Sequence, residues 1–143
     1  MRDIILTTVV RLVLPFIQIY GLYIIINGHL SPGGGFPGGA MMGASMILYA
    51  LAFNLKEGSS KISHDTSTLL ESGGALVFAG LGLVGAFVGS NYLSNRAAGF
   101  PLGVPGNLFS SGMMFLLTMA IGIKVASTFI TLFFNLVEGK AHD

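Results

Sequence analysis

The chain has 143 residues, of which 52% are hydrophobic and 9% are charged, and its mean hydropathy is +0.79. This composition leaves too little polar surface to cover a water-soluble globule, so it predicts an integral membrane protein. Seven Lys and Arg residues nearly balance six Asp and Glu residues, which argues against a nucleic-acid partner. The chain has no cysteine, which excludes disulfides, thiolate metal sites and cysteine nucleophiles.

Four apolar segments approach the ~20 residues that a helix needs to cross a hydrocarbon layer of ~30 Å. They cover residues 4–26, 38–55, 72–92 and 108–136. Helices are expected because backbone polar groups inside lipid must be bonded within their own segment. The sequence therefore predicts an all-α integral membrane protein with four transmembrane helices, which form a single membrane domain over residues 1–143.

The first span carries a charged residue, Arg11, about two turns inside its N-terminal end. Thr7 and Gln18 lie on the same helical face as Arg11. Two interpretations follow. Arg11 is an anchor whose long side chain reaches the membrane interface, or this face lines a groove that holds water or another subunit.

A segment rich in glycine and proline joins the first two spans and reads Gly-His-Leu-Ser-Pro-Gly-Gly-Gly-Phe-Pro-Gly-Gly from residue 28 to residue 39. The two prolines and the phenylalanine favour a defined backbone path over a flexible linker. His29 lies near the membrane boundary, where an imidazole can exchange protons near neutral pH. The alternative is a solvated loop histidine without a role.

Known catalytic constellations are missing from the sequence. It has no paired carboxylates, no Ser/His/Asp set, no nucleophile elbow and no phosphate-binding G-x-x-x-x-G-K-[ST] loop. The three histidines, at positions 29, 64 and 142, are not spaced as metal ligands. We therefore expect neither an enzyme nor a metal site.

The connection between the second and third spans, residues 56–71, is the charged loop of the chain, whereas the other two loops contain just Arg96. Lys and Arg outside the spans gather on the face that this loop shares with both termini: Arg2, Lys56, Lys61 and Lys140. The positive-inside tendency therefore predicts that the N- and C-termini are cytoplasmic. The two loops rich in glycine and proline then face outward.

Small residues form one face of the third span. They are Ala75, Ala79, Gly82, Ala86 and Gly89. Such a face lets another helix approach closely, and we favour packing within this bundle over a dedicated subunit interface.

Lys124 lies near the centre of the fourth span, ~20 Å along the axis from its end. A charge at this depth is costly unless it is paired or hydrated, so it favours a functional role. Hydroxyl groups follow on the same helical face, at Ser127, Thr128 and Thr131. Because no Asp or Glu lies inside a predicted span, we expect a partner protein to supply the counter-charge. Lys124 then either works on ions or is a fixed ion pair between two chains.

Several short motifs lie along the chain. They are Pro15, Gly21-Leu22-Tyr23, the loop of residues 28–39, Leu48-Tyr49-Ala50-Leu51-Ala52, Leu108-Phe109-Ser110-Ser111-Gly112 and Gly122-Ile123-Lys124-Val125. Together they resemble the B subunit of Mrp-type multisubunit sodium/proton antiporters. The resemblance covers most of the chain, and its loop core, His-x-Ser-Pro-Gly-Gly-Gly-Phe, is the most specific part.

The resemblance implies a multi-pass subunit of a bacterial cytoplasmic-membrane complex that exchanges internal sodium for external protons. Sodium and protons would be cargo, and no cofactor is implied. Partners would be membrane lipid and other hydrophobic subunits of the Mrp complex, including the A and D subunits, which resemble proton-pumping modules of respiratory complex I. These partners would carry the missing intramembrane carboxylates.

Within this framework, the subunit contributes to the ion pathway or its gating, or else is purely structural and serves assembly of the same complex. The candidates for the ion pathway or a buried charge are Lys124, Arg11, His29, Ser127, Thr128 and Thr131. The implied loop motif is Ser31, Pro32, Gly33, Gly34, Gly35, Phe36, Pro37 and Gly39.

Overall fold

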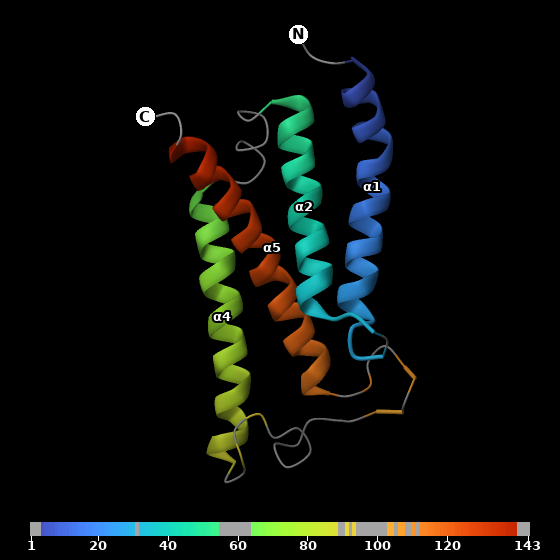
Figure 1. The fold of residues 1–143 in the computed structure, drawn as a ribbon. Helices are drawn as coiled ribbons and strands as arrows, with labels where there is room; N and C mark the ends of the chain where they lie inside the picture. The colour runs from blue at the N-terminus through green and yellow to red at the C-terminus, as the bar shows by residue number, and fades with distance from the viewer. Residues whose placement is uncertain are drawn as a thin grey trace.

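In the computed structural model, the described part of the chain forms four α-helices that pack side by side (Figure 1). The helices are α1 (Ile4–Ile26), α2 (Gly35–Phe53), α4 (His64–Phe87) and α5 (Met113–Gly139). The structure describes residues 4–30, 32–54, 64–88, 91, 93, 103–104, 106–107, 110 and 112–139. All four helices are long and apolar enough to cross a membrane. The prediction of an all-α membrane protein with four spans is therefore confirmed.

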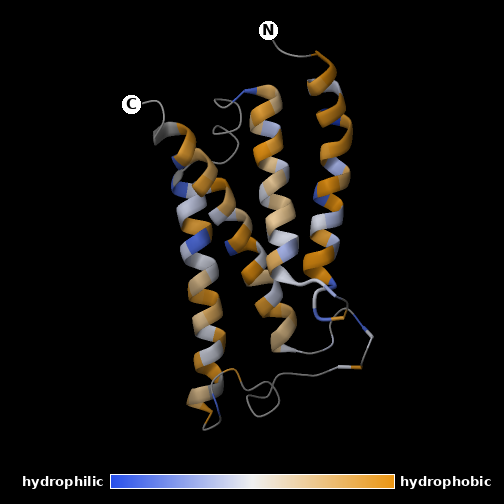
Figure 2. Cartoon of the chain, viewed as in Figure 1, coloured by the Kyte–Doolittle hydropathy of each residue, from blue (hydrophilic) through white to orange (hydrophobic). Residues whose placement is uncertain are grey.

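Helix α5 lies at the centre of the bundle. It packs against α2 on one side and against α4 on the other, and α1 packs on the outer side of α2 (Figure 1). The start of α1 and the end of α5 lie at the same end of the bundle, as the predicted topology requires. Apolar residues surround the helices (Figure 2), which is typical of a bundle that faces lipid or other membrane subunits.

Glycines set the close contact between α2 and α5. A Cβ atom added to Gly39 would lie 2.5 Å from the carbonyl oxygen of Gly122, and one added to Gly43 would lie 2.8 Å from the Cβ of Phe129. In a bilayer, helices associate through such close van der Waals packing, because lipid tails are as apolar as the side chains. The glycine seam therefore holds α2 and α5 together.

Helix α2 begins earlier than predicted, at Gly35 rather than at residue 38. Gly33 and Gly34, which precede it, have φ angles of 152° and 130°, a region that favours glycine. Pro37 lies in the first turn, where its missing N–H has no partner to lose. Residues 35–39 of the glycine-rich segment therefore belong to a helix.

Helix α4 also begins earlier, at His64 rather than at residue 72, and ends at Phe87. Asp65 lies in its first turn, where a negative charge is favourable near the positive end of the helix dipole. As a result Glu71 lies within the helix, inside the candidate span Asp65–Val84. The expectation that the spans contain no carboxylate is therefore wrong.

The remaining bounds differ less. The fourth span was expected to start at residue 108, whereas α5 starts at Met113.

On α4, the small side chains of Ala75, Ala79 and Ala86 are exposed and Gly82 is buried. The exposed alanines do not pack within this bundle, which differs from the interpretation favoured above; Gly89 lies outside the described residues.

Candidate functional site

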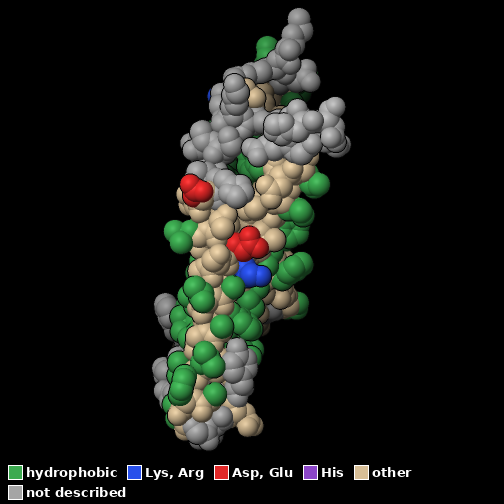
Figure 3. All heavy atoms as spheres, turned by 90° about the vertical axis from the view of Figure 1, so that its left-hand side faces the viewer, with side chains coloured by type: hydrophobic (Ala, Val, Ile, Leu, Met, Phe, Trp, Pro, Cys, Tyr) green, Lys and Arg blue, Asp and Glu red, His purple; other side chains and the backbone are tan. Residues whose placement is uncertain are grey.

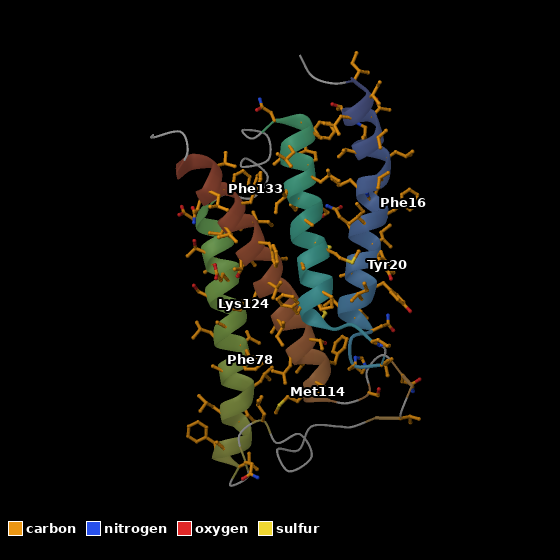
Figure 4. All side chains as sticks on the ribbon, viewed as in Figure 1. Phe16, Tyr20, Phe78, Met114, Lys124 and Phe133 are labelled. Atoms are coloured by element: carbon orange, nitrogen blue, oxygen red, sulfur yellow. The ribbon has the colours of Figure 1, made fainter. Side chains whose placement is uncertain are left out.

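Lys124 lies at the middle of α5, roughly 17 Å along the axis from Met113 and roughly 20 Å from Val137, the limits of its candidate span. Its side chain is half-buried. Figure 4 shows it at mid-height, where α5 runs beside α4. The structure thus places the predicted buried charge at mid-membrane depth, between two helices of the same chain.

Gly74 of α4 packs directly on the stem of Lys124. A Cβ atom added to Gly74 would lie 2.9 Å from the Cβ of Lys124 and 3.0 Å from the carbonyl oxygen of Ala120. Any larger residue at position 74 would therefore push α4 away from the lysine. This glycine is the reason that the backbone of α4 reaches Lys124.

The predicted row of hydroxyl groups on α5 has three different environments. Ser127 is buried, and its hydroxyl donates a hydrogen bond to the carbonyl oxygen of Ser67 on α4. Thr128 donates to the carbonyl oxygen of Lys124 in its own helix, at 2.9 Å. The hydroxyl oxygen of Thr131 is buried and has no hydrogen-bond partner among the described residues. Ser127 therefore belongs to the polar contact with α4, whereas the Thr128 hydroxyl bonds within its own helix.

Glu71 is the residue that sequence reasoning missed. On the face where α4 and α5 meet, Figure 3 shows an acidic surface directly beside a basic one. The acidic side chains described on α4 are Asp65 and Glu71, and Glu71 lies on the same helical face as Gly74, three residues away. A signal was available, because Ser67, Glu71 and Gly74 follow the helical spacing i, i+4, i+7.

His29 lies in the turn after α1, over the beginning of α5. Its ring meets the ring of Phe115 edge-on, with centroids 5.7 Å apart. Both ring nitrogens are buried without a hydrogen-bond partner among the described residues. Phe115 precedes Lys124 by nine residues, or ~13 Å along the helix, so His29 and Lys124 lie at different depths.

The loop motif divides between a turn and a helix. Pro32, Gly33 and Gly34 lie in the connection, and Gly34 is the residue that caps α2. The rest, Gly35, Phe36, Pro37 and Gly39, forms the first turns of α2, while Ser31 lies outside the described residues. A Cβ atom added to Gly35 would lie 2.5 Å from the carbonyl oxygen of Thr118, so this part of the motif packs on α5.

Arg11 lies apart from Lys124, on the face that α1 turns toward α2. Its guanidinium carbon lies 5.5 Å from the ring centroid of Phe53. On the same face, the hydroxyl of Thr7 donates to the carbonyl oxygen of Ala52 at 3.3 Å. A cavity of about 180 Å³ follows, lined by Leu14, Gln18, Met46 and Tyr49. The polar face predicted for the first helix therefore contacts α2.

Metal ligands do not cluster in the described part of the chain, where no group of three or more His, Cys, Asp or Glu could hold an ion. His142 lies outside the described residues. The expectation of no resident metal or cofactor stays a prediction from the sequence.

These features define a class: a multi-pass membrane protein whose lysine and carboxylate lie between helices at the depth of the hydrocarbon layer. The chain belongs to the family of domains related to the MnhB subunit of a Na+/H+ antiporter, whose family model matches residues 5–131. The resemblance stated from the motifs is therefore confirmed. The family is that of a transporter subunit.

Relatives agree with this assignment. A Staphylococcus aureus (strain Newman) protein, which carries the provisional name antiporter subunit mnhB2, is 31% identical over 140 residues, 98% of each chain. An uncharacterized protein of Methanocaldococcus jannaschii is 36% identical over 122 residues, which cover 81% of this chain but 45% of that protein. This chain therefore spans less than half the length of the archaeal relative.

A solved structure has the same fold. One chain of the membrane-bound sulfane sulfur reductase, an archaeal respiratory membrane complex, is 34% identical, with a TM-score of 0.77. The match covers 94% of this chain and 57% of that one. The family and the apolar helices together confirm a multi-pass membrane location, and related chains work in multisubunit membrane complexes.

Proposed function

We propose that this chain is a small membrane subunit of a multisubunit sodium/proton antiporter and that it contributes directly to the ion pathway through Lys124. One observation carries the proposal: a half-buried lysine at the centre of a transmembrane helix, on a face that continues into buried hydroxyl groups. A charge at this depth is expensive, so it is retained where it binds, repels or relays ions.

His29 is the second element of the proposal. A buried imidazole without a hydrogen-bond partner is costly, so water, an ion or another subunit would complete its bonding in the assembled complex. Its place over the first turn of α5 lies at the opposite end of the helix from the end of the chain. His29 would act at the outer mouth of the pathway and Lys124 at its middle.

The proposed partners are the other hydrophobic subunits of the complex, including A and D subunits that resemble complex I modules. The long exposed apolar faces of α1 and α4 support this, since residues such as Phe16 and Phe87 would contact lipid or neighbouring subunits. The cargo would be sodium and protons, moved across a bacterial cytoplasmic membrane without a cofactor.

A structural role in assembly is the second candidate function, and the glycine seam between α2 and α5 favours it. In that case Lys124 would be a fixed charge that holds two chains together. The two candidates differ in what the loss of the lysine does: exchange stops in an intact complex, or the complex itself is lost.

The test is the sodium-dependent dissipation of a pH gradient in membrane vesicles that contain the complete complex. We expect Lys124→Ala to remove most of the exchange while assembly stays intact, because the charge at the centre of the span would be lost. Gly80→Ala is the matched control, because nothing lies within 4 Å of a Cβ atom at Gly80. Full exchange by an assembled Lys124→Ala complex would contradict a role in the pathway.

A further inference from the structure

Two contacts fix how α4 and α5 lie against each other. The Ser127 hydroxyl bonds to the Ser67 carbonyl oxygen, and a Cβ atom at Gly74 would meet the Ala120 carbonyl oxygen. The helices are antiparallel (Figure 1), so seven residues forward on α4, from Ser67 to Gly74, match seven residues back on α5, from Ser127 to Ala120. Glu71, four residues after Ser67, therefore lies level with residues 123 and 124 of α5.

The helical faces agree with this register. Ser67, Glu71 and Gly74 form one stripe of α4 at the spacing i, i+4, i+7. Ala120, Lys124 and Ser127 form the facing stripe of α5 at the same spacing. Both charged side chains are half-buried, and an acidic surface lies beside a basic one in the view toward α4 (Figure 3). Glu71 and Lys124 thus face each other across the α4/α5 seam.

Other charged side chains of the described residues lie elsewhere. Asp65 lies nine residues before Gly74, ~13 Å along α4, and is exposed. Helix α2 carries no charged residue, and Arg11 of α1 lies over the ring of Phe53. Glu71 is therefore the acidic neighbour of Lys124 among the described residues of every helix that packs against α5.

A polar row extends from this pair toward one end of the bundle. Lys124, Ser127 and Thr131 follow at i, i+3 and i+7 on α5, and the Thr131 hydroxyl oxygen is buried without a partner in the described structure. Buried polar atoms of this kind are usually bonded to water. The row runs toward the end where α1 begins and α5 ends.

We propose that Glu71 is a proton-carrying carboxylate of this subunit, paired with Lys124 across the α4/α5 seam and reached along the row of Ser127 and Thr131. The inference rests on the proposed role of Lys124. A hydronium ion gives its proton to the Glu71 carboxylate, which leaves a carboxylic acid and water, while Lys124 keeps its ammonium group. The net charge of the pair changes from zero to +1, and the positive pair repels a nearby sodium ion. Protonation and cation release are coupled in this way.

Carbodiimide labelling tests the proposal without relying on activity. Dicyclohexylcarbodiimide reacts with protonated carboxyl groups in apolar surroundings, and mass spectrometry locates the modified residue. In the complete complex we expect the labelling of Glu71 to increase as the pH falls. The exposed Asp65 on the same helix should stay unlabelled. Lys124→Gln should change the labelling of Glu71 several-fold at a given pH if the two side chains are paired across the seam.

Exchange in vesicles provides the second measurement. Glu71→Gln should lower exchange by about a hundredfold in an assembled complex, whereas Asp65→Asn should leave it unchanged. An unlabelled Glu71, when other carboxyl groups in the same complex react, would overturn the proposal. So would labelling that does not depend on Lys124. Labelling of the wild-type protein needs no variant, so it decides the matter even if Glu71→Gln fails to assemble.

The two proposals can fail separately. Loss of exchange in Lys124→Ala together with normal exchange in Glu71→Gln would overturn the carboxylate role alone. Normal exchange in assembled Lys124→Ala would overturn the proposed function, and the inference on Glu71 with it.

Discussion

Helix α5 packs against its two main neighbours, α2 and α4, in different ways. Against α2 the contact is close and built on glycine, with Gly39 on Gly122. Against α4 the contact carries the hydrogen bond from Ser127 to Ser67, and its register brings Glu71 level with Lys124. One transmembrane helix therefore has a close-packed seam and a polar seam.

The difference between the two seams supports the proposed division between stability and transport. Helices associate in lipid through close packing between small residues, so helix association alone accounts for the seam with α2. Burying charges and unpartnered hydroxyls costs free energy, and apolar residues of similar size would often hold two helices together as well. The polar seam with α4 is therefore the one that we propose for ion movement.

The largest effect on stability should come from the glycine seam. We expect Gly39→Ala to destabilise the subunit by about 1–3 kcal/mol, because the new Cβ atom would lie 2.5 Å from a backbone oxygen. Gly80→Ala should instead be neutral, or stabilising by up to about 1 kcal/mol, since it removes a helix glycine that has no neighbour within 4 Å. Thermal unfolding in detergent measures both variants. Equal stability of the two would show that the α2 contact is not tight.

An intermediate effect should come from the bond that crosses the polar seam. Ser127→Ala should cost about 1 kcal/mol, because it removes the hydrogen bond to Ser67 and leaves a buried carbonyl oxygen without that donor. Thr128→Ala is the control, since its hydroxyl donates within its own helix. Hydrogen exchange of the amides around Ser67 reports loosening of α4. If both variants loosen α4 equally, the Ser127 bond does not fix the seam.

The smallest effect should come from Arg11. Arg11→Gln removes the contact with the ring of Phe53, which at an exposed site is worth about 0.5–1 kcal/mol. Exchange in vesicles should not change, because Arg11 lies on the α1/α2 face rather than on the polar seam. Loss of exchange in an assembled Arg11→Gln complex would show that the pathway includes the face of α1, with Thr7 and Gln18.

Most of the fold was predictable because it depends on length and hydropathy. Four apolar runs near the thickness of a bilayer can hardly fold otherwise. Helix starts were harder: Pro37 and Asp65 look like loop residues in the sequence, yet both fit the first turn of a helix. The single-domain organisation and the cytoplasmic location of the termini stay predictions.

The candidate site was predictable only in part. Lys124 and its hydroxyl neighbours follow from periodicity on one helix. Contacts between helices do not follow from periodicity, because the register of two antiparallel helices depends on which glycines pack against the neighbouring helix. Glu71 therefore counted as a loop residue, and the contact of His29 with Phe115 was not foreseen. The expected counter-charge on a partner protein now has a candidate within this chain.

The most direct test of the account is exchange per assembled complex, measured in the same vesicles for Lys124→Ala and Gly39→Ala. We expect Lys124→Ala to assemble but to lose exchange. Gly39→Ala should lower the amount of complex and leave the exchange of each assembled complex near that of the wild type. If Lys124→Ala instead loses assembly, or keeps full exchange once assembled, the polar seam is not part of the ion pathway.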